Sequence, residues 1–123
     1  MAYAQQATAT VQAPNKRWYE AAAAMKRRAE SWGDQAYGAV LVRDDQVIGE
    51  GPSRVIKLSD SSAHAEREAI RDAQRRLQAT MLEGSILYST SRPCALCESA
   101  AAAVGVRRMY FGESLHDAGT PKP

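Results

Sequence analysis

The sequence has few cysteines and no long apolar run, and each shortage excludes a class of protein. Two cysteines in 123 residues are too few for a disulfide-stabilised secreted scaffold. No apolar run approaches the roughly 20 residues that a membrane-spanning helix needs. The segment from Met1 to Pro14 lacks the charged start and apolar middle of a secretory signal. We therefore expect a cytoplasmic protein with no membrane partner.

An excess of charge of one sign is also missing. The chain carries 16 Lys and Arg against 14 Asp and Glu, a formal net charge of +2. Its basic pairs are scattered over different predicted elements, which is typical of solvated faces: Arg27/Arg28, Arg75/Arg76 and Arg107/Arg108. A nucleic-acid-binding face would need a stronger basic bias. RNA is not excluded by the composition, but it is not favoured.

The patterns predict a flexible arm over residues 1–14 and a single domain over 15–123. The arm is mostly Ala, Gln and Thr and has little to bury. Apolar residues at helical spacing predict a helix from Lys16 to about Trp32, ended by Gly33. Further elements follow in order: strands 37–42 and 46–50, a helix 63–79, a strand 85–90, a helix 93–104, a strand 107–112 and an irregular tail 113–123. This order predicts an α/β fold, with a mixed sheet of four to five strands and helices on both faces.

Glu66 interrupts an apolar stripe. In the predicted helix the stripe runs through Ala63, Ile70, Ala73 and Leu77, and Glu66 takes the missing place. A carboxyl group on the inward side would be desolvated, which raises its pKa and suits proton transfer near neutral pH. A capping box would need Ser or Thr at position 63. A buried ion pair with an arginine remains the alternative.

His64, Cys94 and Cys97 form a candidate metal site. The two cysteines stand three residues apart, so their sulfurs leave the same face of a helix. A closed structural zinc site needs four ligands, whereas a catalytic zinc site keeps a position open for water. Because His116 is the only other histidine, three ligands and a catalytic Zn²⁺ are favoured. Two alternatives stay open: a redox cysteine pair, and a non-catalytic zinc-binding protein closed by His116.

His64-Ala65-Glu66, followed by Pro93-Cys94-Ala95-Leu96-Cys97, resembles the signature of the zinc-dependent cytidine deaminase superfamily. The segments 37–51 (YGAVLVRDDQVIGEG), 62–70 (SAHAEREAI) and 110–112 (YFG) are similar to its branch of tRNA adenosine deaminases, guanine deaminase and fungal cytosine deaminase. The resemblance implies a three-layer cytidine-deaminase-like fold. It also implies that His64, Cys94 and Cys97 hold Zn²⁺, and that Glu66 carries protons from the attacking water to the ring nitrogen and the leaving amine.

Four residues are candidates for contact with the substrate: Ser53, Ala65, Arg92 and His116. Ser53 stands where many relatives carry an Asn that binds the base or sugar. Arg92 replaces the Glu or Ser that often precedes the Pro-Cys pair. Its permanent charge could meet an anionic substrate or pair with a nearby acid, and we favour the ion pair. His116 is included as a residue of the tail.

The predicted reaction is hydrolysis of a cyclic amidine C–N bond. It would release ammonia from a free nucleobase, a nucleoside or a similar small amino-heterocycle, and the alternative is adenosine-to-inosine deamination in tRNA. The segment after Glu113 is shorter than the final strand and helix of the tRNA enzymes and guanine deaminases, which weighs against copying their substrates. It also predicts a homodimer or a higher homo-oligomer whose subunits cover surface that would otherwise be exposed.

Overall fold

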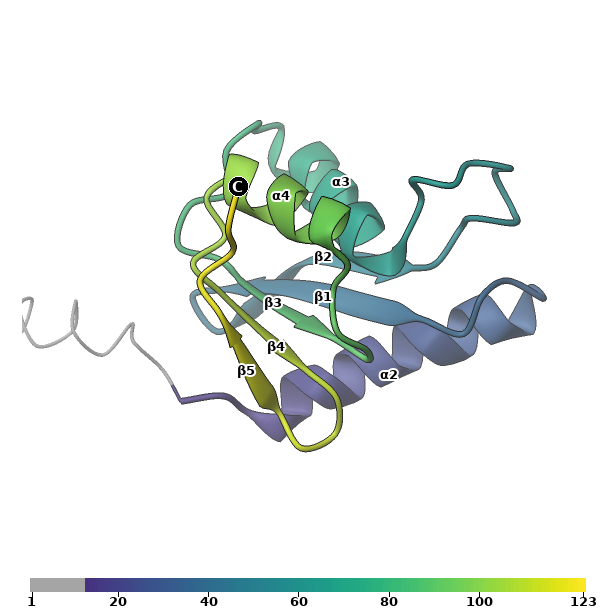
Figure 1. The fold of residues 1–123 in the computed structure, drawn as a ribbon, viewed down its shortest axis with the longest axis horizontal. Helices are drawn as coiled ribbons and strands as arrows, with labels where there is room; N and C mark the ends of the chain where they lie inside the picture. Colours follow the sequence, from purple (N-terminus) through teal and green to yellow (C-terminus); the bar gives the residue numbers. More distant parts are fainter. Residues whose placement is uncertain (1–12) are drawn as a thin grey trace, which may run out of the picture.

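A computed structural model describes residues 13–123 and is built around a mixed sheet (Figure 1). Its elements are α2 (Lys16–Ser31), β1 (Gly38–Arg43), β2 (Gln46–Pro52), α3 (Ala65–Leu77), β3 (Ile86–Ser89), α4 (Ala95–Ala103), β4 (Arg108–Phe111) and β5 (His116–Gly119). The strand order is β2-β1-β3-β4-β5. β3 and β4 are parallel, and all other neighbours are antiparallel. Within the described range, no helix has the length and apolar character needed to cross a membrane.

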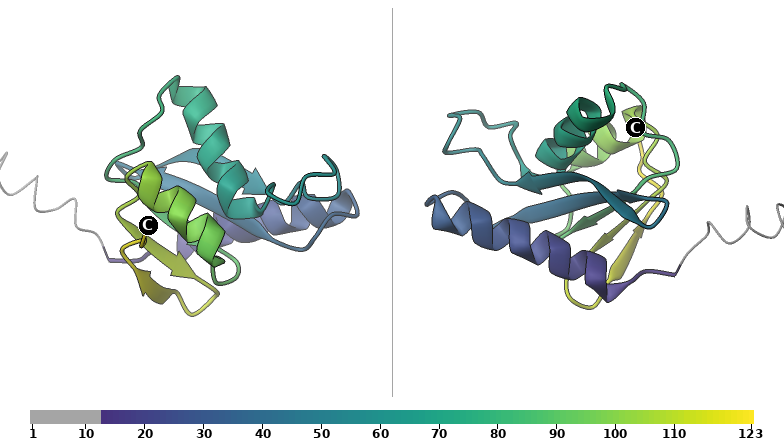
Figure 2. Two further views of the ribbon diagram at one scale, coloured as in Figure 1. Left: turned by 45° about the horizontal axis from the view of Figure 1, so that its top comes forward. Right: turned by 180° about the vertical axis from the view of Figure 1, so that it is seen from behind.

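The helices form one layer on each side of the sheet, as Figure 2 shows, with α2 on one face and α3 and α4 on the other. β1 explains why both faces are covered, because successive side chains of a strand point to opposite sides. Ala39 and Leu41 pack in the core beneath α3 and α4, whereas Val40 and Val42 pack in the core beneath α2. The predicted α/β three-layer fold is therefore confirmed. Apart from residues 13 and 14, the predicted N-terminal arm lies outside the described residues.

Helix α2 begins and ends close to the predicted residues, for local reasons. The Asn15 side chain accepts a hydrogen bond from the backbone N–H of Arg17 at 2.9 Å, which caps the first turn. Gly33 follows the helix with a φ of +76°, a conformation that favours glycine. Buried Trp18 and Met25 lie on the face turned to the sheet.

The C-terminal segment differs from the prediction of an irregular tail. Residues His116–Gly119 form β5, which pairs antiparallel with β4, and Leu115 packs against the core beneath α2. The chain reverses direction at Gly112 and Leu115, which both have positive φ. An ion pair of 2.9 Å between Arg108 and Asp117 joins the two strands. The tail prediction was wrong because strand pairing at a sheet edge gives a short polar segment its partners.

Gly51 allows α3 to lie directly on β2. A Cβ atom at this position would overlap the carbonyl oxygen of Ala65 and the backbone nitrogen of Ala69. The first turn of α3 can therefore approach the strand only because residue 51 has no side chain. This close approach positions the helix end that carries His64 and Glu66.

Substitution Gly51→Ala is expected to lower the free energy of unfolding by about 3 kcal/mol, because backbone atoms rather than a flexible side chain block the new methyl group. Urea unfolding of both proteins measures the loss. Gly84→Ala is the control, since nothing lies within 4 Å of its Cβ position and only its φ of +80° is unfavourable. The control should lose about 1 kcal/mol. Equal losses at the two positions would contradict the packing argument.

Candidate metal and catalytic site

The site lies where α3 and α4 begin. β2 and β3 both run antiparallel to β1, so they point the same way, and each is followed by a loop and a helix. The first turns of α3 and α4 are thereby brought together at the same end of the strands. His64 is the N-cap of α3 and Cys94 is the N-cap of α4, with Cys97 in the first turn. Pro93 therefore lies before the helix, whereas the sequence predicted a helix that begins at residue 93.

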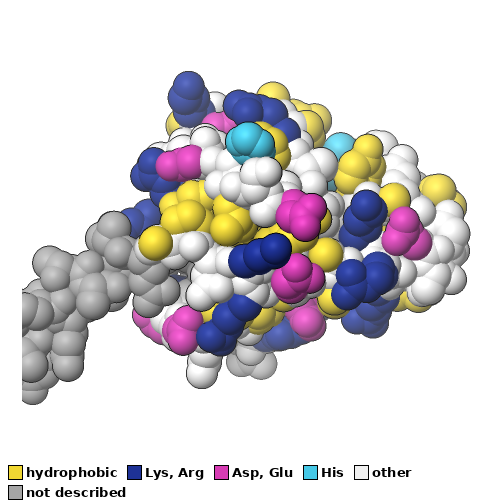
Figure 3. Space-filling model, turned by 90° about the horizontal axis from the view of Figure 1, so that it is seen from below, with side chains coloured by type: hydrophobic (Ala, Val, Ile, Leu, Met, Phe, Trp, Pro, Cys, Tyr) yellow, Lys and Arg dark blue, Asp and Glu magenta, His cyan; other side chains and the backbone are white. Residues whose placement is uncertain are grey.

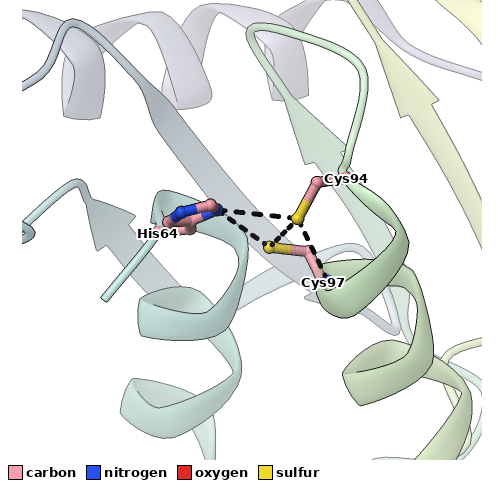
Figure 4. A group of neighbouring side chains, drawn as sticks. All are labelled: His64, Cys94 and Cys97. Carbon is pink, nitrogen blue, oxygen red and sulfur yellow. Dashed lines mark hydrogen bonds between the residues drawn. The ribbon is translucent and has the colours of Figure 1, made fainter. Parts of the chain in front are cut away.

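Figure 4 shows the three predicted metal ligands pointing toward one another. His64 Nδ1 lies 3.4 Å from Cys97 Sγ and 3.7 Å from Cys94 Sγ, and the two sulfurs are 3.4 Å apart. Tetrahedral zinc with Zn–S of about 2.3 Å and Zn–N of about 2.0–2.1 Å places its ligand atoms about 3.5–3.8 Å from each other. One imidazole and two sulfurs at these separations fit Zn²⁺.

The surroundings of the ligands also suit a metal ion. The His64 side chain makes no capping hydrogen bond, so its ring is not used to cap α3. Burial, followed by the nearby Glu66 carboxyl, raises the pKa of the Cys97 thiol. A divalent cation would reverse this effect by stabilising the thiolate form.

A fourth protein ligand is not found in residues 13–123, where the one group of three or more candidate side chains consists of His64, Cys94 and Cys97. His116, the predicted closing ligand of the alternative site, is instead stacked on Phe111 with ring centroids 5.3 Å apart. The arrangement therefore has the three protein ligands of an open site.

Glu66 is buried beside the metal group, with 6% of its surface exposed. Burial raises its pKa to about 7, and the neighbouring Ser89 hydroxyl and Cys97 thiol offset only part of the rise. A carboxyl group with such a pKa can both accept and return a proton near neutral pH.

The sequence left open a buried ion pair between Glu66 and an arginine, but in the structure it is Glu68 that pairs with arginines. Its carboxylate oxygens lie 3.1 Å from Arg54 and 2.8 Å from Arg71. Among the described residues, no arginine or lysine lies within ion-pair distance of Glu66. Two buried acids on one helix thus have different environments, and Glu66 is the one without a cation.

A cavity of about 410 Å³ opens onto the metal group and Glu66. This volume is within the range of about 300–1,000 Å³ that is usual for small-molecule sites. Its lining consists of Gln35, Tyr37, His64, Ala65, Glu66, Ser91, Arg92 and Cys94. A larger, more open depression of about 530 Å³ lies at the C-terminal end of α3 and contains none of the predicted site residues.

The cavity contains two of the four predicted substrate contacts, Ala65 and Arg92, but not Ser53 or His116. Ser53 is fully buried and its hydroxyl donates to Asp34 at 3.1 Å. Asp34 also accepts a 2.8 Å hydrogen bond from the backbone of Lys57, so this pair holds the loop after β2 in place. The Ser53 hydroxyl is therefore used within the fold, and Ser53 does not line the cavity, in contrast to the expected substrate contact.

Gln35 and Tyr37 are cavity residues that the sequence did not indicate. They precede β1 and belong to no metal or acid–base motif. Gln35 and the half-exposed Tyr37 reach the cavity because the connection between α2 and β1 lies beside the first residues of α3 and the residues before α4. No local pattern in the sequence could have indicated this placement.

The chain also matches a known protein family over most of its length. A family model described as the cytidine and deoxycytidylate deaminase zinc-binding region matches residues 12–113. The chain belongs to this family. The predicted Zn²⁺ cofactor is thereby confirmed, because a zinc-binding family model and a suitable ligand group coincide.

The chain is similar to several known deaminases of this family. The chain is 37% identical over 100 residues to a tRNA-specific adenosine deaminase of Buchnera aphidicola, covering 81% of this chain and 66% of the relative. It is 37% identical over 82 residues to guanine deaminase of Bacillus subtilis, covering 67% and 53%. A solved structure from work on A-to-I editing by tRNA:A34 deaminases has a TM-score of 0.76 at 37% identity, covering 80% and 71%. The chain thus spans about half to two thirds of the length of these curated relatives.

Proposed function

We propose that the chain is a zinc-dependent hydrolytic deaminase of an amino-bearing nucleobase ring. The observation that carries this proposal is the desolvated Glu66 carboxyl next to an open three-ligand metal group, both facing one cavity. A structural zinc site would need neither an acid–base group nor a cavity. Family membership supports the same reaction class.

Each residue has a defined task in the proposed reaction. Zn²⁺ held by His64, Cys94 and Cys97 would act as a Lewis acid that activates a water molecule. Glu66 accepts a proton as the water oxygen bonds to the amino-bearing carbon, and passes it to the adjacent ring nitrogen. It then transfers the second proton of the attacking water to the amine, the C–N bond breaks, and ammonia leaves. The carbon keeps the oxygen as a carbonyl group, so atoms and protons balance.

Adenosine in tRNA is the first substrate to test, because the relatives described as tRNA-specific adenosine deaminases include identities from 36% to 43%. A free base or nucleoside is the second candidate. It is supported by the guanine deaminase relative and by the weak net charge of +2. On the face drawn in Figure 3, basic and acidic side chains are interspersed, whereas an RNA-binding face would favour a basic stripe.

Ammonia release by the zinc-loaded protein would test the proposed function. The panel contains an RNA stem-loop with a loop adenosine, together with adenosine, guanine, guanosine, cytosine and cytidine. We expect turnover of at least one of them and none with Glu66→Ala. Inosine formed in the stem-loop alone would favour adenosine in RNA as the substrate. Ammonia released from a free compound would favour a free base or nucleoside. If every substrate failed with folded, zinc-loaded protein, the proposal would be rejected.

Self-association is also proposed, as a homodimer or higher homo-oligomer of a single cytoplasmic domain. Ile56 and Leu58 are 58% and 53% exposed in the loop after β2, and Leu96 is 70% exposed on α4. Large exposed apolar side chains favour contact with another protein surface.

A further inference from the structure

Arg92 lies on the wall of the cavity, two residues before the metal ligand Cys94. Its backbone is anchored on both sides. The Thr90 N–H donates to the Gly38 carbonyl at 2.9 Å, and Pro93 is buried. The position of the Arg92 backbone relative to the metal group is therefore set by the sheet and by the start of α4.

Among residues 13–123, the guanidinium of Arg92 has no acidic partner. Ion pairs within residues 13–123 use five other arginines: Arg54, Arg71, Arg75, Arg76 and Arg108. The ion pair favoured from the sequence is thus not formed. Arg92 is also the one lysine or arginine among the residues lining the cavity. Because guanidinium stays protonated at neutral pH, Arg92 places on the cavity wall a positive charge that forms no ion pair within residues 13–123.

The Arg92 guanidinium lies over an aromatic ring of β4, which is itself stacked on a ring of β5. The Arg92 Cζ atom lies 5.4 Å from the centre of the Phe111 ring. Phe111 is stacked on His116 at 28° between the ring planes, and the two residues are direct partners in the strand register. A cation–π contact uses the charge of the guanidinium but none of its N–H donors. The donors therefore remain available to a ligand in the cavity.

We propose that Arg92 is a specificity-determining residue that binds a phosphate group carried by the substrate, and that Phe111 and His116 are positioning residues. This inference rests on the proposed deaminase function and adds the class of substrate. A planar guanidinium can bind phosphate through two parallel N–H···O bonds. The formal charges of Zn²⁺ and two thiolates cancel, so the metal group would not offset the attraction of Arg92 for an anion. Phosphate is the anion that mononucleotides and RNA carry close to the base.

Calorimetric binding to zinc-loaded Glu66→Gln protein tests this proposal without turnover. The probes are three pairs: adenosine and its 5′-monophosphate, guanosine and its 5′-monophosphate, and cytidine and its 5′-monophosphate. At least one monophosphate should bind about 10- to 100-fold more tightly than its nucleoside. Adding Arg92→Gln should remove this preference by weakening the monophosphate much more than the nucleoside, whereas Arg92→Lys should keep part of it. Arg107→Gln removes an exposed charge outside the cavity lining and is the matched control.

The positioning role of the rings has its own readout. Phe111→Leu should reduce the phosphate preference several-fold by weakening the monophosphate more than the nucleoside, because it removes the ring and keeps an apolar side chain. Phe111→Tyr should restore the preference. A purely structural role of Phe111 would instead weaken nucleosides and monophosphates equally, which would contradict its assignment as a positioning residue.

A second set of probes identifies the source of the phosphate. RNA trinucleotides without a terminal phosphate carry only phosphodiesters, so Arg92-dependent binding of these alone assigns an RNA backbone phosphate. Arg92-dependent binding of the monophosphates assigns a terminal phosphate. The proposal is overturned if no probe shows a preference, or if the preference survives Arg92→Gln. Ammonia release from neutral nucleosides without any phosphate preference would reject the Arg92 proposal alone. An intact preference with no turnover of any substrate or phosphorylated probe would reject the deaminase function alone.

Discussion

Substitution Glu66→Gln is expected to lower ammonia release at least about 1,000-fold, because an amide cannot accept and return the protons that the reaction moves. The two side chains have nearly the same shape, so the cavity should be preserved. At 6% exposure the position disfavours a charge, and a neutral amide carries none. Zinc content and thermal stability should therefore not fall.

The measurement combines steady-state ammonia release with zinc content and the melting temperature. Glu83→Gln makes the same chemical change at an exposed position outside the cavity lining, and should retain full activity. Substantial turnover by Glu66→Gln would remove Glu66 from its proposed role. Loss of zinc together with activity would show that the carboxyl supports the metal group instead of transferring protons.

Substitution His64→Asn is expected to reduce bound zinc from about one per chain to near zero. The change removes one of three protein ligands, and the remaining thiols of Cys94 and Cys97 are more than 3 Å apart with no described replacement nearby. Activity should be lost with the metal. The melting temperature should also fall, because metal binding stabilises the folded state that contains the site.

His116→Asn is the matched control for the second histidine. His116 is stacked on Phe111 and is not part of the metal group, so zinc content should stay near one per chain. Elemental analysis gives the stoichiometry, and the absorption spectrum of the cobalt form reports the ligand set. A loss of metal in His116→Asn similar to that in His64→Asn would favour a closed, non-catalytic site.

The elements that were predicted correctly depend on interactions between near neighbours. Buried Trp18, Ala22 and Met25 recur at helical spacing in α2, and Asn15 caps it. The apolar run of β1 shows a strand covered on both faces. The grouping of His64, Cys94 and Cys97 could also be predicted, because the residues stand in short motifs.

The missed features depend on strand pairing and packing that the pattern of residue types does not show. β5 is a strand because a tight turn places it beside β4. Gln35 and Tyr37 line the cavity because the connection between α2 and β1 lies beside the first residues of α3 and the residues before α4. Neither relation leaves a periodic or local pattern.

The sequence by itself determined the α/β class and singled out the proposed metal ligands and the proposed acid–base residue, because residue types and short spacings specify them. Tertiary structure alone decided which polar side chains face the cavity. The Ser53 hydroxyl donates to Asp34, whereas Arg92 forms no ion pair in the described part of the chain and its guanidinium lies over the Phe111 ring. The physical reason is that the partner of a side chain is set by packing over the whole fold, and a charge or hydroxyl is available to a ligand only if no nearer group has bound it.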